Sequence, residues 1–275
     1  MPHSILITGC STGIGYTAAH ALQKRGYEVI ASCRQLDDVT RLQAEGLTCI
    51  QLDLANTASI DNGIQQALTL TEGRLNALFN NGAYGLAGAL EDLPTDGLRE
   101  QFETNFFGWH HLTTALIPHF RQFDDARIVQ NSSVLGFVAM SYRGAYNSSK
   151  FAIEGWTDTL RLELANTGIR VALLEPGAIE TQFRANCLRA FQRWIDANNS
   201  VHAQAYQQQI ARLSSRKSKS AQALPPEACL PPLLDALESN HPKLRYRITR
   251  PTKIIALLKR LLSGKMIDKI VQKAS

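Results

Sequence analysis

The chain has 275 residues, of which 44% are hydrophobic and 19% charged, an ordinary composition for a globular protein with a large buried core. Its formal net charge of +5 is concentrated at the end, because residues 243–275 hold ten of the 29 Lys and Arg but only one of the 24 acids, Asp268. The body is therefore mildly acidic. With neither zinc-ligand spacing nor an aromatic RNA-binding signature, the sequence argues against a nucleic-acid partner.

The cysteines and the N-terminus favour a cytoplasmic location. The five cysteines are odd in number and no two form a CxxC pair, so we expect neither a disulfide framework nor a metal site. The opening sequence MPHSILITG lacks the charged start and long apolar core of a signal peptide. No apolar run reaches the roughly 18 residues that cross a bilayer.

Seven short β-branched segments alternate with longer segments of helical periodicity. In chain order they are SILIT from Ser4, YEVIAS from Tyr27, LTCIQ from Leu47, LNALFN from Leu75, ARIVQN from Ala126, IRVALLE from Ile169 and LRYRIT from Leu244. Strands that are apolar on both faces and separated by helices indicate a parallel sheet covered on both sides. We therefore expect an α/β fold, a doubly wound parallel seven-stranded Rossmann sheet in a single domain over residues 1–250.

Two segments depart from this alternation. Residues 182–222 are rich in Gln and Ala, have a helical pattern, and form an insertion before the last strand. Residues 251–275 form an amphipathic tail with lysines between apolar residues. Four roles fit such a tail: a cap on a substrate cleft, a subunit contact, a peripheral contact with an anionic membrane, and packing on its own domain. We favour the cap or local packing over membrane contact.

A glycine-rich turn, TGCSTGIG, follows the first strand and opens a helix. Glycine allows a tight turn there and lets a diphosphate approach the helix N-terminus. A plain strand-to-helix loop is the alternative, but the position after strand one of a parallel sheet favours a dinucleotide site. The turn residues expected at the cofactor are Gly9, Ser11, Thr12, Gly13, Ile14 and Gly15.

The end of the second strand indicates which dinucleotide is bound. A carboxylate at this point would select NAD, whereas here Cys33 is followed by Arg34, whose guanidinium suits the 2′-phosphate of NADP. A solvated surface arginine is the alternative, and we favour NADP(H). Asp53 and Leu54, after the third strand, are further candidates at the cofactor. Asp53 could accept a hydrogen bond from the adenine amino group, with a helix cap as its alternative.

The segment GAYNSSKFAIEG places Tyr146 four residues before Lys150, in what the pattern predicts to be the first turn of a helix. Side chains at that spacing lie on one helix face. A phenol titrates near pH 10, so it needs a nearby cation to act as an acid or base near neutrality.

These motifs together resemble the short-chain dehydrogenase/reductase family over about residues 4–250. They occur in the family's order as TGCSTGIG, DLAN, NNGA, TNFFG, NSS, YNSSK and EPGAIET. The resemblance implies that Tyr146 donates the proton to a carbonyl and that Lys150 holds the nicotinamide ribose and lowers the tyrosine pKa. It also implies that Ser133, rather than its neighbour Ser132, holds the substrate oxygen, and that Asn105 holds a water of a proton relay.

The resemblance assigns two further loops to the cofactor. In EPGAIET, Pro176 and Gly177 shape the loop beside the nicotinamide, with Ile179 in the same loop, and Thr181 contacts the nicotinamide or the diphosphate. After the fourth strand the family usually has N-N-A-G, but here the two small residues are exchanged. We keep Asn81 and Gly82 as cofactor residues and expect a small local shift at the exchanged pair.

The segments VLGFVAMSY and YGLAGAL are apolar and favour an apolar aldehyde, ketone or alcohol as substrate, with Val134 and Tyr84 beside it and no metal required. Core-facing loops are the alternative. The chain resembles the steroid and retinol dehydrogenase branch in its glycine turn, in Arg34 and in the 182–222 insertion. Family members usually pair through helices that here cover about residues 100–122 and 145–166, so we expect a homodimer or homotetramer.

A second function hypothesis is an NADPH-binding regulator without turnover. Such proteins typically lose part of the catalytic tetrad, whereas all four positions are filled here. An epimerase or dehydratase is disfavoured because the glycine spacing and the C-terminal region differ from theirs. We therefore expect an NADP-dependent oxidoreductase.

Overall fold

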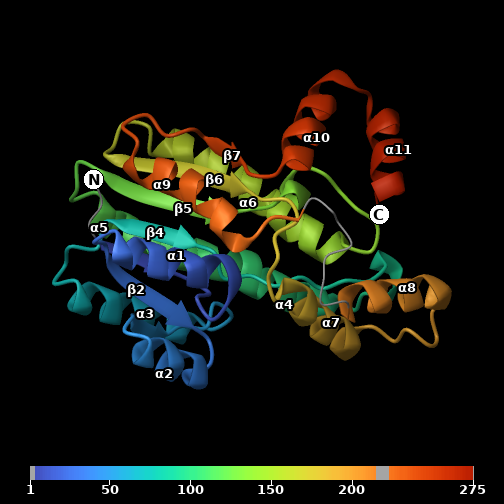
Figure 1. The fold of residues 1–275 in the computed structure, drawn as a ribbon, viewed down its shortest axis with the longest axis horizontal. Coiled ribbons are helices and arrows are strands. Elements are labelled where there is room, and N and C mark those ends of the chain that lie inside the picture. Colours follow the sequence, from blue (N-terminus) through green and yellow to red (C-terminus); the bar gives the residue numbers. More distant parts are fainter. Residues whose placement is uncertain (1–3, 215–222, 275) are drawn as a thin grey trace.

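The computed structural model describes residues 4–214 and 223–274. Within them, seven strands form one parallel sheet in the order β3-β2-β1-β4-β5-β6-β7 (Figure 1). The strands are β1 (Ser4–Ile7), β2 (Glu28–Cys33), β3 (Thr48–Gln51), β4 (Ala77–Asn80), β5 (Ala126–Asn131), β6 (Ile169–Glu175) and β7 (Arg245–Arg247). The predicted doubly wound sheet is confirmed, and each strand falls on one of the seven predicted segments.

Helices cover both faces of the sheet. The first set is α1 (Gly13–Lys24), α2 (Leu36–Ala44) and α9 (Leu230–Glu238), and the second is α3 (Thr57–Leu70), α5 (Gly108–Phe120) and α6 (Gly144–Glu163). Each set contributes side chains to its own buried cluster against the strands. Because the strand order reverses between β1 and β4, the carboxyl ends of these strands open into a crevice at the switch point.

The remaining helices lie at the same end of the molecule as this crevice. After β4 come a 3₁₀ turn (Leu90–Asp92), α4 (Thr95–Phe102) and a π-helical turn (Glu103–Phe107) that leads into α5. The insertion folds as α7 (Phe183–Trp194) and α8 (Ala203–Ser214), and its residues 215–222 lie outside the described residues. A third apolar cluster joins α7 and α8, and the Tyr206 hydroxyl on α8 donates to Asp92.

The tail, predicted as one amphipathic element, consists of two helices, α10 (Arg250–Leu261) and α11 (Gly264–Ala274), which form a hairpin that projects from the body (Figure 1). Thr249 caps α10 by accepting a hydrogen bond from the Thr252 amide. Of the helices in the described residues, none has the length and apolar character needed to cross a membrane.

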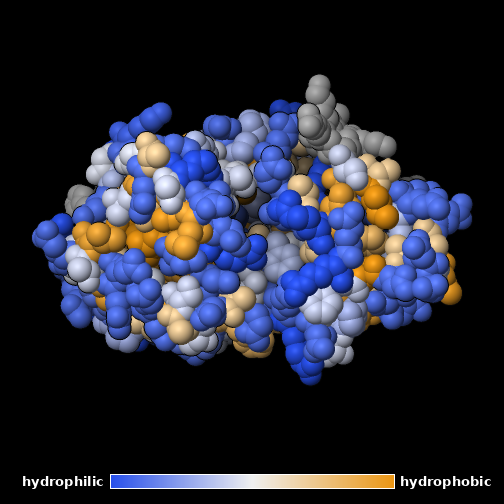
Figure 2. All heavy atoms as spheres, turned by 90° about the horizontal axis from the view of Figure 1, so that it is seen from below, coloured by the Kyte–Doolittle hydropathy of each residue, from blue (hydrophilic) through white to orange (hydrophobic). Residues whose placement is uncertain are grey.

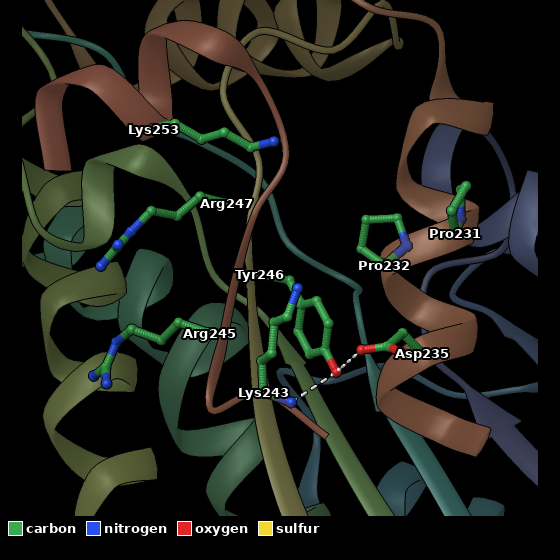
Figure 3. A pocket seen from close by; sticks show the side chains of 8 residues that line it. All are labelled: Pro231, Pro232, Asp235, Lys243, Arg245, Tyr246, Arg247 and Lys253. Carbon is green, nitrogen blue, oxygen red and sulfur yellow. Dashed lines mark hydrogen bonds between the residues drawn. The ribbon is translucent and has the colours of Figure 1, made fainter. Parts of the chain in front are cut away.

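The short edge strand β7 is held by its tyrosine (Figure 3). The Tyr246 hydroxyl donates to Asp235 on α9 at 2.6 Å and accepts from the Lys243 amide at 2.9 Å. A depression of about 430 Å³ lies beside this strand, lined in part by Pro232 and Lys253. It is at the outer edge of the sheet, on the far side of β6 from the strand that leads to Ser133.

We expect Arg127→Ala to lower the free energy of unfolding by about 3 kcal/mol. The Arg127 guanidinium is buried, pairs with Asp125 at 2.7 Å and donates to the carbonyls of Ala236 and Ser239, which the change would leave without this donor. Urea unfolding measures the effect. Arg170→Ala is the matched control, since Arg170 pairs with the same Asp125 from a half-exposed position and should cost less than about 1 kcal/mol. Equal costs for both variants would contradict the prediction.

Candidate active site

The candidate site lies where the carboxyl ends of β1, β4, β5 and β6 meet the loops that follow them. The face seen in Figure 2 is hollowed near its middle, between the part that carries the sheet and the part formed by α7 and α8. The glycine turn, the segment after β5, the start of α6 and the loop after β6 all converge on this crevice. The fold therefore brings together motifs that lie far apart in the sequence.

The glycine turn depends on a close crossing of two backbones. Gly9 has a φ of +70°, and a Cβ there would lie 2.5 Å from the Gly82 Cα. Gly13 also has a positive φ, +64°. The N-cap of α1, Thr12, makes no side-chain capping hydrogen bond, so the first amides of α1 are left for another acceptor. A turn of this kind, opening onto uncapped amides, fits a diphosphate.

Thr8 and Asn81 hold the crossing in place. The Thr8 hydroxyl accepts hydrogen bonds from the amides of Asn81 and Gly82, both at 2.9 Å. The Asn81 side-chain amide donates to the carbonyls of Thr8 and Gly9 at 3.0 and 3.1 Å. Asn81 also accepts from the Asn131 amide at 2.8 Å, which links β4 to β5. Asn81 therefore shapes the cofactor turn, a role that the motif alone does not reveal.

The exchanged pair Gly82-Ala83 is accommodated by Leu54. A Cβ on Gly82 would lie 2.8 Å from the Leu54 Cδ1, so the leucine side chain occupies the space that an alanine would need. Ala83 packs against the buried cluster that contains Trp109. The Trp109 indole in turn donates to the Gly82 carbonyl at 2.8 Å. The methyl of Ala83 is thus directed into the core beneath the crevice.

The expected adenosine end lies beside β2 and β3. Arg34 is exposed directly after β2, and Ser11 is held by Arg41, whose guanidinium donates to the Ser11 carbonyl at 2.7 Å. The Asp53 carboxylate accepts from the Ala55 amide at 3.0 Å. The cap of α3 is Asn56 instead, so the helix-cap interpretation of Asp53 is wrong.

Tyr146 and Lys150 lie on the first turns of α6 with their side chains buried, 8% and 1% exposed. The Lys150 ammonium donates to the Asn131 carbonyl at 2.7 Å. It also lies 4.2 Å from the centroid of the Trp109 ring and 5.8 Å from that of Tyr146. Sequence reasoning missed Trp109, although its position one helical turn after Asn105 in TNFFGWH was the available signal.

Burial shifts the pKa values of both groups in the direction of their neutral forms. Burial lowers the pKa of Lys150 to about 7, although the charge of Glu154 opposes this shift. Burial raises the pKa of Tyr146, and a hydrogen bond from Ser133 opposes that shift. The expected lowering of the tyrosine pKa by the lysine charge stays a prediction. Burial therefore favours the protonated form of the phenol, and it brings the pKa of the neighbouring amine close to neutrality.

Ser133 and Ser132 point to different partners. Ser133 hydrogen-bonds Tyr146, and its hydroxyl oxygen also accepts from the Leu135 amide at 3.1 Å, which starts a 3₁₀ turn, Val134–Gly136. The Ser132 hydroxyl instead lies near the buried carboxyl of Glu154, where it opposes the rise that burial gives the pKa of that carboxyl, but it makes no hydrogen bond of normal geometry. The local geometry thus separates the two hydroxyls and gives Ser133 the position beside the phenol.

Asn105 lies in the π-helical turn, and its side chain is buried. Its carboxamide accepts from the Tyr84 amide at 3.1 Å and donates to the Tyr84 carbonyl and to the Ser149 hydroxyl at 2.9 and 3.2 Å. It therefore ties the loop after β4 to α6, next to Lys150. The water relay assigned to Asn105 stays a prediction.

The loop after β6 closes the cofactor side of the crevice. Pro176 accepts from the Val134 amide at 2.9 Å, and Ile179 forms a bridge with Leu224. A Cβ on Gly177 would collide with Thr249, so glycine is required where this loop meets the start of α10. The Thr181 methyl lies against Gly13, where an added Cβ would be 2.8 Å from it. Thr181 is therefore placed directly over the glycine turn.

Helix α7 covers the Tyr146 side chain. The Phe183 ring packs edge-on against Tyr146, with the ring centroids 5.2 Å apart, and Cys187 lies close enough to influence the pKa of Tyr146. Sequence reasoning missed both, since no motif marks them.

The Tyr84 hydroxyl donates to Glu100 at 3.4 Å, and Val134 is half-buried. The substrate contacts predicted for Tyr84 and Val134 stay predictions.

Comparisons with known proteins place this site in a family. A model of the short chain dehydrogenases matches residues 3–190. Uncharacterized oxidoreductase YbbO of Escherichia coli K12 is 38% identical over 272 residues, 99% of this chain and 95% of that protein. Human retinol dehydrogenase 8 is 31% identical over 254 residues, 89% of this chain and 80% of that protein. The chain belongs to the short-chain dehydrogenase family and is an oxidoreductase resembling the retinol dehydrogenase-like branch.

Solved structures share the fold. A Burkholderia phymatum short-chain dehydrogenase in complex with NAD matches with a TM-score of 0.77 at 23% identity over 94% of each chain. A Burkholderia cenocepacia short chain dehydrogenase in complex with NADP matches with a TM-score of 0.70 at 20% identity, covering 95% of this chain and 98% of that chain. At these identities the matches show the fold alone.

We expect Lys150→Met to remove part of the pH dependence of stability. Because folding lowers the lysine pKa to about 7, the unfolded chain binds more protons than the folded chain from there up to about pH 10. The contribution of Lys150 to the free energy of unfolding therefore rises with pH in this window, and this gain is lost as the pH falls toward 7. Between pH 7 and about pH 9, the free energy of unfolding of the wild type should rise by on the order of 2 kcal/mol relative to that of the variant.

Urea unfolding without cofactor at several pH values measures this gain. Lys24→Met, which removes an exposed lysine of α1, is the control and should keep the wild-type slope. Parallel pH profiles for the wild type and Lys150→Met would contradict the prediction.

Proposed function

We propose that the protein is an NADP(H)-dependent oxidoreductase that interconverts an apolar aldehyde or ketone and its alcohol. The observation that carries the proposal is the convergence of Ser133, Tyr146 and Lys150 in a buried site beneath Phe183. A hydroxyl donor, a protonated phenol and an amine of shifted pKa form the set that protonates a carbonyl oxygen in a site shielded from water.

The glycine turn fits a nicotinamide dinucleotide, which when bound supplies or accepts the hydride. The uncapped amides of α1 would hold the diphosphate, and Lys150 would hold the nicotinamide ribose. Arg34 supports NADP over NAD because it is exposed at the end of β2 and no carboxylate takes its place there. Arg41, held against Ser11, adds a second cation at this end of the site, although Asp38 and Glu45 pair with it.

The proton chemistry follows from the same groups. In carbonyl reduction the Tyr146 hydroxyl gives its proton to the substrate oxygen, and the Ser133 hydroxyl stabilises the negative charge that develops there. Lys150, with a pKa of about 7, can pass a proton toward Tyr146 at physiological pH. Oxidation of the alcohol runs the same transfers in reverse.

The substrate side supports an apolar molecule. Phe183 and Cys187 from α7 lie beside the phenol, the half-buried Val134 follows Ser133 in the chain, and the cluster that joins α7 and α8 is apolar. The similarity to retinol dehydrogenase 8, whose name gives a long apolar alcohol, points to the same class of substrate. An NADPH-binding regulator without turnover is the second candidate, which the complete tetrad disfavours.

A homodimer or homotetramer is part of the proposal. The helices expected to pair, covering about residues 100–122 and 145–166, expose Phe107 and Leu162 by 49% and 68%. Large apolar side chains of this exposure favour a subunit contact. Light scattering at micromolar protein tests it, and a monomer would overturn it.

We expect Tyr146→Phe to lower turnover by roughly 10²- to 10⁴-fold, the usual contribution of a general acid. The assay is NADPH oxidation with a panel of aldehydes and ketones from short-chain to retinoid and steroid, and kcat/KM of the wild type should rise with apolar size. Tyr27→Phe, on the far side of the sheet where its hydroxyl donates to Glu238, is the control. Tight NADPH binding without turnover of any panel member would favour the regulator.

We expect Arg34→Ala to raise the KM for NADPH by about tenfold or more and to leave the KM for NADH nearly unchanged. A charge-assisted hydrogen bond to the 2′-phosphate contributes about 1.5–3 kcal/mol, which only NADPH would lose. Steady-state kinetics with both cofactors measures the effect. Arg99→Ala, an exposed arginine on α4, is the control. An equal loss with NADPH and NADH would contradict the role of Arg34.

A further inference from the structure

The tail hairpin has a concentration of exposed apolar side chains. Among the described residues, thirteen large hydrophobic side chains are exposed, and five of these are on α10 and α11. They are Ile254 (58%), Leu257 (58%), Leu261 (71%), Met266 (50%) and Ile270 (37%), here called the tail stripe. The spacings of three and four residues within each helix place each set on one helix face.

The tail stripe is not the face by which the hairpin packs. Ala256 and Ile267 are buried, at 4% and 9% exposure, and Ile255, Leu258 and Leu262 are half-buried beside them. A helix that packs only on its own domain needs one apolar face, with polar residues opposite. In this hairpin the packing face and the tail stripe are both apolar, so local packing does not account for the stripe.

The side chains that flank the stripe are cationic. Lys253, Lys259, Arg260, Lys265 and Lys269 are exposed on the hairpin, and Asp268 is the one acid on the described part of α10 and α11. Lysines placed beside apolar side chains on short helices suit an interface in which the apolar groups are buried and the ammonium groups meet anions.

A basic hollow lies beside the C-terminal half of α10. It measures about 490 Å³, and Phe137, Phe151, Arg247, Lys259 and Arg260 line part of it. Lys259 donates to the Phe137 carbonyl and lies 5.3 Å from the centroid of the Phe151 ring, which itself is 41% exposed. The acids of the hollow, Glu154 and Glu175, are bound by Arg245 and Arg247. Lys259 and Arg260 are therefore positioned for an anionic group arriving from outside.

We propose that the hairpin α10–α11 docks on the surface of an anionic lipid bilayer. The tail stripe enters the boundary between head groups and acyl chains, and the flanking lysines and the basic hollow meet the lipid phosphates. A second copy of the hairpin would bring like charges together, so the charge pattern favours lipid over tail-to-tail pairing. The inference goes beyond the proposed function and is tested without any measurement of turnover.

Cosedimentation of the full chain with vesicles tests the proposal. Vesicles of phosphatidylcholine with phosphatidylglycerol should bind the protein, whereas phosphatidylcholine alone should bind it weakly, and added salt should release it. Leu257→Ser/Leu261→Ser should weaken binding at least about tenfold, since each leucine loses most of its apolar transfer free energy. Lys265→Gln/Lys269→Gln should weaken binding by about fivefold for each lysine, on anionic vesicles only.

Leu36→Ser/Leu70→Ser is the control because both leucines are exposed, by 61% and 46%, on α2 and α3. It should bind as the wild type does, and thermal unfolding should show that every variant is folded. Absence of binding to anionic vesicles would overturn the proposal, as would equal losses in the control and in the stripe variant. A wild-type dimer that the stripe variant makes monomeric, without vesicle binding, would identify the stripe as a subunit interface instead.

Discussion

The burial of the Lys150 ammonium is the constraint on which the rest of the site depends. A buried cation is costly, and the Asn131 carbonyl and the Trp109 ring, from two different elements, offset part of that cost. Both contacts require that α5 and α6 pack in fixed positions relative to the end of β5. The same burial brings the lysine pKa to about 7, so the packing of this side chain also sets its protonation near neutral pH.

The second constraint is the close approach of two backbones at the switch point of the sheet. Gly9 and Gly82 cross where side chains would collide, and the Thr8 hydroxyl fixes the crossing through two amides. Trp109 takes part in both features. Its indole donates to the Gly82 carbonyl, and its ring faces Lys150. The glycine turn and Lys150 are therefore linked through one buried tryptophan.

The outer parts of the molecule differ in character from this centre. The insertion packs by an apolar cluster and places Phe183 against the Tyr146 ring, whereas the tail hairpin is basic and exposes a second apolar face. The insertion and the tail meet at Gly177. The loop that leads to the insertion passes close to Thr249, directly before the tail, and leaves no space for a side chain there. Ser133, Tyr146 and Lys150 are positioned by the sheet and by α6. The insertion and the tail lie outside this centre.

The sequence by itself determined the sheet and the placement of Tyr146 and Lys150 on one helix. The strand periodicity located all seven strands, and the spacing of Tyr146 and Lys150 placed both on one helix face, because these are local patterns of two to four residues. Only the tertiary structure decided that Ser132 and Ser133 face different partners, that Asn56 rather than Asp53 caps α3, and that α7 covers the phenol. It also decided which face of the tail packs, since such outcomes depend on contacts between segments that no local pattern encodes.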